Sequence, residues 1–247
     1  DWDCELSTHF SEVNLGLRAR VSSGLDWAFE QVDEALIFED DCLPDSTAFE
    51  YCRQLLERYR NDPRVMHISC VNLTGQQDPD SSYYGSRYPH VWGWATWRRA
   101  WRLYGETAAV PPSDALTERV LASFENPAVR RFWKTMWNWV RAGRIDSWAY
   151  SWAFTCQVHN GLSITPNVNL VSNLGFGEAA THTTDVESSA HAMPVESITF
   201  PLRHPTQLVV HAEADRMLEG LAYSLASPLR MCLTAAKRMM RKLLMGR

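Results

Sequence analysis

Apolar and polar positions near the start of the chain follow first a strand pattern and then a helix pattern. A short apolar run over residues 35–38 ends in three acids, which is typical of a buried strand. Residues 47–60 then carry apolar side chains at helical spacing, and residues 61–63 (Asn-Asp-Pro) end that pattern. A second apolar run covers residues 65–69. The order strand, helix, strand predicts a β–α–β unit and a parallel sheet.

The remaining pattern predicts further helices and one clear loop. Residues 74–89 are polar and rich in Gly, Ser and Tyr, which indicates a long loop. Trp94, Trp97 and Trp101 have helical spacing and are expected to be packed in the interior. Further elements are expected as helices over residues 22–31, 115–124, 127–142 and 147–159 and as a strand over residues 162–164.

Length and composition fit one large α/β domain with a tail. The chain has 247 residues and 45% hydrophobic content, ample for a core. Its six cysteines include no metal-type or CxxC spacing, so we expect reduced thiols in a cytoplasmic protein. No signal peptide or membrane-spanning run is visible. We expect one domain over residues 1–205 and a helical tail over residues 206–247.

The formal net charge of −5 conceals a basic end. Residues 230–247 contain six basic side chains and no acid, so the rest of the chain is strongly acidic and does not favour nucleic acid as a partner. Apolar residues at intervals of three and four over residues 229–247 predict an amphipathic helix. This helix either contacts an anionic membrane surface, at the inner face of the cytoplasmic membrane, or packs on the domain.

The acids at the end of the first predicted strand are the strongest chemical signal. Glu39, Asp40 and Asp41 are adjacent, and close carboxylates remain ionised most easily with a cation among them. Oxygen ligands suit Mg²⁺ or Mn²⁺, which often also take phosphate oxygens from a substrate. The pattern favours a divalent-metal site for a phosphorylated substrate. The alternatives are a solvated loop and a cap for the following helix.

Four other segments carry candidate chemistry. Asp146 precedes a predicted helix and is either its N-cap or a general base. Trp92, Gly93 and Trp94 either pack in the core or offer a sugar-stacking surface. The polar stretch that contains Asn173, Gly175 and His182 resembles loops whose backbone N–H groups hold phosphate, and His182 is a candidate metal ligand. Arg18 and Arg20 are either solvated or contact a phosphate or base.

Together these motifs resemble a bacterial glycosyltransferase with a GT-A nucleotide-diphospho-sugar transferase domain. The resemblance is carried by Asn14-Leu15-Gly16, Glu39-Asp40-Asp41, residues 89–97, the Asp146 helix and residues 167–183. It covers residues 1 to about 185. The chain is similar to family 2 enzymes and, more distantly, to N-acetylglucosaminyltransferase I. The resemblance implies a Rossmann-like, mixed but mainly parallel sheet flanked by helices.

The resemblance also implies roles for the candidate residues. Asp41, with His182, would hold Mn²⁺ or Mg²⁺ at the diphosphate of a UDP-sugar, with Glu39 and Asp40 beside the sugar and ribose. Gly16, Arg20, Asn173 and Gly175 would contact the donor nucleotide, and residues 92–94 the sugar and acceptor. Asp146 would take the proton of an acceptor hydroxyl on a glycan or lipid-linked glycan. The implied reaction inverts the anomeric carbon.

Two departures from the family pattern keep other functions open. Too few residues precede Asn14 to build the strand–helix unit that begins the GT-A fold, which predicts a truncated N-terminal part. Related sequences carry a second acid where this chain has Ala149. The alternative is therefore a non-catalytic nucleotide-sugar or carbohydrate-binding module. A sugar-phosphate nucleotidyltransferase would need a Gly-rich N-terminal loop with Lys or Arg, which is absent from the sequence.

Overall fold

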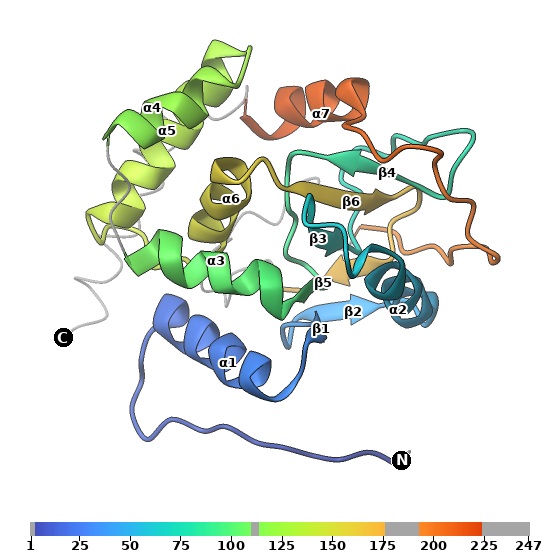
Figure 1. Ribbon diagram of the computed structural model, residues 1–247, viewed down its shortest axis with the longest axis horizontal. Helices are drawn as coiled ribbons and strands as arrows, with labels where there is room; N and C mark the ends of the chain where they lie inside the picture. The colour runs from blue at the N-terminus through green and yellow to red at the C-terminus, as the bar shows by residue number, and fades with distance from the viewer. Residues whose placement is uncertain (1–2, 110–113, 176–192, 224–247) are drawn as a thin grey trace.

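The computed structural model describes residues 3–109, 114–175 and 193–223, and the fold in this part is mixed α/β (Figure 1). The helices are α1 (Leu17–Gln31), α2 (Thr47–Tyr59), α3 (Arg98–Ala109), α4 (Asp114–Ala122), α5 (Pro127–Arg141), α6 (Ala149–Val158) and α7 (Ala212–Leu218), which runs into a π-helix, η1 (Glu219–Tyr223). The strands are β1 (Glu34–Ile37), β2 (Cys42–Pro44), β3 (Val65–Ser69), β4 (Tyr83–Ser86), β5 (Trp94–Trp97), β6 (Leu162–Pro166) and β7 (Val171–Asn173).

The main sheet has five strands in the order β1-β5-β3-β6-β4. Only β3 and β6 pair in parallel, whereas the β1–β5, β5–β3 and β6–β4 pairings are antiparallel. The prediction of a mainly parallel sheet is therefore wrong at the level of strand pairing. Strands β1 and β3 do run in the same direction, but β5 lies between them and pairs with both.

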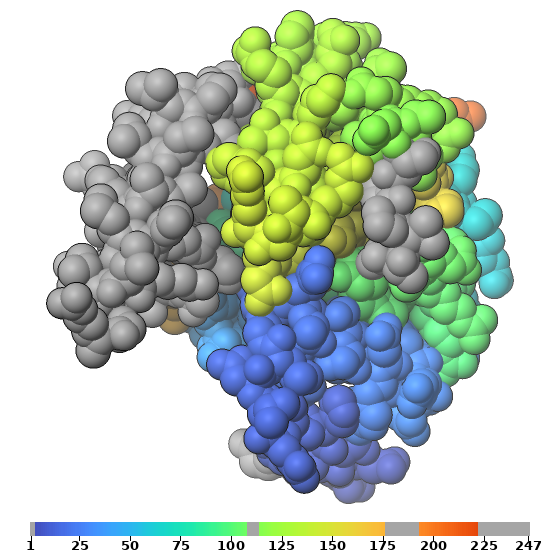
Figure 2. All heavy atoms as spheres, turned by 90° about the vertical axis from the view of Figure 1, so that its left-hand side faces the viewer, coloured from blue at the N-terminus to red at the C-terminus, as the bar shows by residue number. Residues whose placement is uncertain are grey.

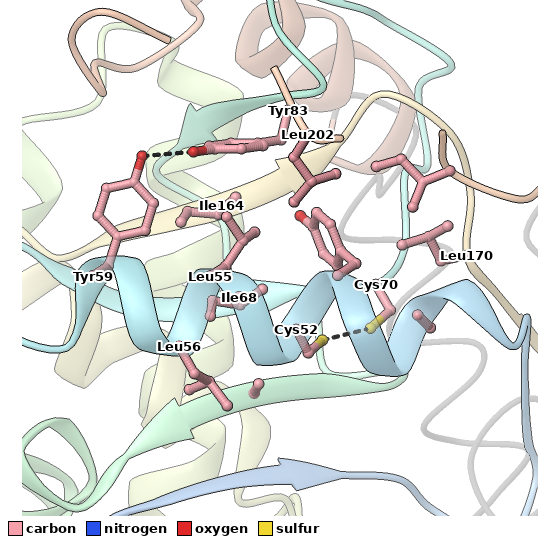
Figure 3. Close-up of a cluster of buried hydrophobic side chains, with 14 of the residues drawn as sticks. Cys52, Leu55, Leu56, Tyr59, Ile68, Cys70, Tyr83, Ile164, Leu170 and Leu202 are labelled. Atoms are coloured by element: carbon pink, nitrogen blue, oxygen red, sulfur yellow. Dashed lines mark hydrogen bonds between the residues drawn. The ribbon is translucent and has the colours of Figure 1, made fainter. Parts of the chain in front are cut away.

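The two faces of the sheet bury different sets of side chains, because successive residues of a strand point to opposite faces. Leu36 and Phe38 pack against one hydrophobic cluster, which we call the α2 core. Ala35 and Ile37 pack against a second cluster, which we call the tryptophan core. Figure 3 shows the α2 core between that helix and the sheet. The tryptophan core joins α1, α3 and α6 around four indoles, from Trp94, Trp101, Trp148 and Trp152.

Most predicted elements are present, and two differences are instructive. Strand β4 lies inside the predicted 74–89 loop and is completely buried. Burial of the polar Tyr83 hydroxyl is possible because this group forms hydrogen bonds in the interior. The Tyr83 hydroxyl lies 2.8 Å from the Tyr59 hydroxyl and 2.8 Å from His204 Nδ1. The helix expected from residue 22 begins at Leu17 instead. A tertiary contact, described below, extends it toward the N-terminus.

The first part of the predicted tail packs on the sheet. Val210 forms a bridge with Gly85 of β4, and the Asp215 carboxylate accepts hydrogen bonds from Ser86 Oγ at 2.6 Å and Arg87 N at 3.0 Å. The amphipathic pattern of residues 229–247 lies outside the described residues. Within the described ranges, every helix is too short or too polar to cross a membrane.

Candidate functional site

The acid loop, residues 39–41, is attached to the end of β7 through backbone and side-chain contacts. Strands β2 and β7 pair antiparallel immediately after it, with Cys42 opposite Asn173. Leu174 N donates to the Asp41 carbonyl at 2.8 Å, and Asn173 Nδ2 donates to Asp41 Oδ1 at 3.3 Å. The fold thus brings together two segments that the sequence separates by about 130 positions, and both carry predicted donor-site residues.

Gly175 approaches Asp41 so closely that a larger residue would displace the Asp41 carboxylate. A Cβ at position 175 would lie 2.0 Å from Asp41 Oδ2, whereas Gly175 N donates to Asn173 Oδ1 at 2.8 Å. The Asp41 carboxylate therefore occupies the place that a side chain at position 175 would need. The structure places the predicted residues Asp41, Asn173 and Gly175 in one cluster.

Glu39 lies half-buried at the other end of the acid loop. Burial raises the pKa of its carboxyl group above the usual value, and the negative charges of Asp41 and Asp40 raise it further. A hydrogen bond from the Trp148 indole acts in the opposite direction. This repulsion between neighbouring carboxylates is the electrostatic condition that a bound cation relieves. Trp148 was not singled out from the sequence, although it lies two positions after the candidate acid Asp146.

Asp146 caps a helix, but a different one from that predicted. Its Oδ2 accepts a hydrogen bond from Leu17 N at 2.7 Å, and its Oδ1 accepts one from Arg18 N at 3.3 Å. These N–H groups belong to the first turn of α1 and have no acceptor within the helix itself. Asp146 supplies that acceptor, which explains why the helix begins early. The helix after Asp146, α6, has no side-chain cap, so the prediction that Asp146 is its N-cap is wrong.

Gly16 meets Asp146 at the same place. Its φ of 77° lies in the left-handed region, and a Cβ there would be 2.7 Å from Asp146 Oδ2. In Figure 2, the yellow-green surface at the end of the α5 region meets the blue surface near the N-terminus. Gly16 and Asp146, two predicted site residues, are therefore in direct contact.

Arg20 contacts the N-terminal segment. Its Nη1 lies 3.2 Å from His9 Nδ1, and its Nη2 donates to the His9 carbonyl. The His9 ring in turn stacks on Trp27, with 5.2 Å between ring centroids. The Arg20 guanidinium is thus already engaged by residue 9. Its predicted contact with a nucleotide stays a prediction.

Trp94 and Trp97 are buried, as predicted, but they lie in strand β5, so the helical spacing predicted for them is wrong. Trp94 stacks on Trp148 with 5.5 Å between ring centroids, and its complete burial leaves no ring face for a sugar, so the sugar contact that the resemblance implies is wrong for this residue. Gly93 has a φ of 60°, and a Cβ there would lie 2.7 Å from Phe38 Cε1, so its close approach is to protein. Trp92 is half-buried against the α2 core.

The donor atoms suit a hard cation in kind, although they do not form a complete cage. Among the described residues, no group of three or more His, Cys, Asp or Glu side chains is arranged to hold a metal ion. Mg²⁺ commonly binds through one or two carboxylates together with water and substrate phosphates, so Asp41 and its acidic neighbours fit this type of site. His182, the other predicted ligand, lies outside the described residues.

Comparison with known proteins adds no family assignment, since neither a family model nor a curated protein matches the chain.

Proposed function

We propose that this protein is a metal-dependent inverting glycosyltransferase that uses a nucleotide-diphospho-sugar donor, UDP-linked in the simplest case, and an acceptor hydroxyl on a glycan or lipid-linked glycan. The observation that carries the proposal is the cluster of Asp41, Asn173 and Gly175 beside Glu39. It lies just beyond the carboxyl end of a sheet strand, where open α/β sheets commonly bind nucleotides.

In this proposal Asp41 is the residue that holds the divalent cation. Its Oδ1 is oriented by Asn173, and its Oδ2 lies against Gly175, where no side chain displaces it. The cation, when bound, neutralises charge on the diphosphate leaving group. Glu39, restrained by Trp148, lines the sugar side of the same site, and Asp40, which is exposed, is available to a ribose or sugar hydroxyl.

Asp146 is the candidate base for the acceptor hydroxyl. The side chain is exposed, and each carboxylate oxygen can accept more than one hydrogen bond. The contact from Arg18 N to Oδ1 is long, at 3.3 Å, so Oδ1 has the greater remaining capacity to accept a proton. The two N–H groups of α1 orient the carboxylate, a requirement for general base catalysis.

The second candidate is a non-catalytic module that binds nucleotide sugars. Two observations favour it. Asp146 already has a structural role as the cap of α1, and position 149, where an acid would be expected from the resemblance, is an alanine at the start of α6. Such a module would bind a donor through the same acid loop and release no product.

The two candidates are separated by measuring binding and turnover on the same preparation. A panel of nucleotide sugars is incubated with the full chain and Mn²⁺, and nucleoside diphosphate release is followed with and without candidate acceptors. The glycosyltransferase proposal expects Mn²⁺-dependent release that is abolished in Asp41→Ala. Donor binding without release supports the binding module. Release that is unchanged in Asp41→Ala, or independent of metal, contradicts the proposed mechanism.

A further inference from the structure

A second pocket, distant from the acid loop, lies between the C-terminal end of α2 and residues 205–209. Its volume is about 430 Å³, within the range of small-molecule sites. One wall contains Arg58 and Arg64, and the other contains Thr206 and Gln207. Arg64 directly precedes β3, whereas the acid loop follows β1, which runs in the same direction. The two sites therefore lie at opposite ends of the sheet.

The lining of this pocket is basic. It includes two arginines and no acidic residue. Arg64 is partly neutralised by Asp62, whose Oδ2 lies 2.7 Å from Arg64 Nη2. Arg58 differs, because no carboxylate within the described ranges forms an ion pair with it. A guanidinium that lines a pocket without a carboxylate partner is a natural site for an oxyanion.

Aromatic neighbours hold the Arg58 side chain in place. Its guanidinium carbon lies 5.7 Å from the centre of the Tyr59 ring, and it donates a hydrogen bond to the Tyr83 hydroxyl. Tyr83 is fixed in turn by Tyr59 and His204 at 2.8 Å each, and Figure 3 shows the Tyr59–Tyr83 bond. This network lowers the entropy that Arg58 loses on binding a ligand.

The opposite wall offers both polar and apolar contacts. Thr206 and Gln207 are exposed polar residues, and their hydroxyl and amide groups are suitable donors to a phosphoryl oxygen. Pro205 and Val209 line the same pocket with apolar surface, and Val209 is 61% exposed. The pocket is several times larger than a phosphate group requires, so it has room for an organic body on this surface.

We propose that this pocket binds a small organic phosphate, with the phosphoryl group on Arg58 and Thr206 and the organic body against Pro205 and Val209. Arg64 contributes additional positive potential at the mouth. This site is independent of the acid loop and of the proposed transferase activity. Its ligand is recognised by charge and shape, so a sugar phosphate is a suitable probe.

The test is a titration of the full chain with glucose 6-phosphate, inorganic phosphate, chloride and glucose at constant ionic strength. Binding is measured by calorimetry and by the arginine side-chain NMR signals. We expect saturable binding of glucose 6-phosphate, weaker binding of inorganic phosphate and none of glucose. Arg58→Gln should weaken binding about tenfold or more, the usual scale for loss of a charged hydrogen bond. Arg53→Gln is the matched control, because Arg53 lies on the same helix but pairs with Glu50.

Three outcomes would overturn the proposal: a response that does not saturate, an equal response to chloride, or equal weakening by Arg58→Gln and Arg53→Gln. Arg58→Lys provides a second variant that keeps the charge and removes the planar guanidinium. It should bind with intermediate affinity. Asp41→Ala should leave this binding unchanged, so failure of the transferase proposal is distinguishable from failure of this one.

Discussion

His67 shows how individual contacts fix the chemistry of a buried residue. Its Nδ1 lies 3.1 Å from the Trp152 indole nitrogen, which can only donate, and its Nε2 lies 2.9 Å from the His90 carbonyl, which can only accept. These partners select the neutral ring with its proton on Nε2. Burial acts in the same direction and lowers the pKa of His67 to about 3. The residue therefore has a structural role in the tryptophan core.

A pH dependence of stability follows from this histidine. Because its pKa is lowered in the folded state, its stabilising contribution is complete above the unfolded value near 6.5 and is lost as pH falls toward 3. The expected slope is about 1.4 kcal/mol of unfolding free energy per pH unit within that window. Burial lowers the pKa of His90 to about 4, so its effect has the same sign.

Urea unfolding between pH 7 and pH 5 measures this slope. The wild type should lose stability as pH falls, and His67→Gln should show a shallower dependence. The control is His159→Gln, since His159 is exposed and should leave the slope unchanged. A wild-type slope equal to that of His67→Gln would show that His67 is not the titrating group.

Gly175 gives a second test at the scale of one residue. In Gly175→Ala the new Cβ would overlap Asp41 Oδ2 and force the carboxylate to move. We expect at least a tenfold loss of Mn²⁺-dependent nucleotide binding, measured by calorimetry, on the scale seen when a neighbour that orients a metal ligand is changed. Gly105→Ala is the control, because a Cβ there meets nothing within 4 Å. Unchanged binding in Gly175→Ala would separate this glycine from the proposed metal site.

At the scale of elements, helix α1 depends on a carboxylate that is distant in sequence. The interaction between Asp146 and α1 spans 129 positions, so no local signal could predict that the helix begins at Leu17. Helix α2 was predicted almost to the residue because its amphipathic pattern is local. Its cap lies outside that pattern, since Asp45 Oδ1 accepts a hydrogen bond from Thr47 N at 2.8 Å.

Two substitutions at position 146 separate the capping role from the proposed catalytic role. Asp146→Ala removes both hydrogen bonds and should lower the unfolding free energy by about 0.5–2 kcal/mol, as for loss of a helix cap. Asp146→Asn keeps an accepting oxygen for Leu17 N but cannot take a proton. It should lose less stability, measured by urea unfolding, and abolish transfer.

Full transfer activity in Asp146→Asn would reject Asp146 as the base while leaving its role as a cap intact. Equal stability of Asp146→Ala and the wild type would show instead that α1 does not need this cap.

At the scale of the molecule, fold class and most element positions could be predicted, whereas strand pairing could not. Periodicity reports which faces are buried, but it carries no information on which strand lies beside which, and so β5 between β1 and β3 was missed. Strand β4 was hidden by a Tyr-Tyr-Gly-Ser composition typical of loops. The acid loop was found because its charge pattern is local. Its partnership with Asn173 and Gly175 was expected only from the resemblance.

The buried thiols provide a probe of global unfolding. The five described cysteines are free, with Cys4 exposed and Cys52 and Cys156 buried. Burial raises the pKa of the Cys156 thiol, and a hydrogen bond with Cys70 together with burial raises that of Cys52, so both are protonated and inaccessible. A thiol reagent at pH 8 should label Cys4 within minutes and the buried pair only in urea, as read by peptide mass spectrometry. Rapid native labelling of Cys52 would contradict this packing.

The central claim is that Asp41 and its neighbours form a cation-dependent nucleotide site. Calorimetric titration of the full chain with UDP, with and without Mn²⁺, tests it most directly. The variant is Asp41→Asn. The control is Asp33→Asn, because Asp33 is an exposed acid that directly precedes β1. The account predicts saturable UDP binding that requires Mn²⁺, is retained in Asp33→Asn and is lost in Asp41→Asn. UDP binding that is absent, independent of Mn²⁺ or unchanged in Asp41→Asn would contradict it.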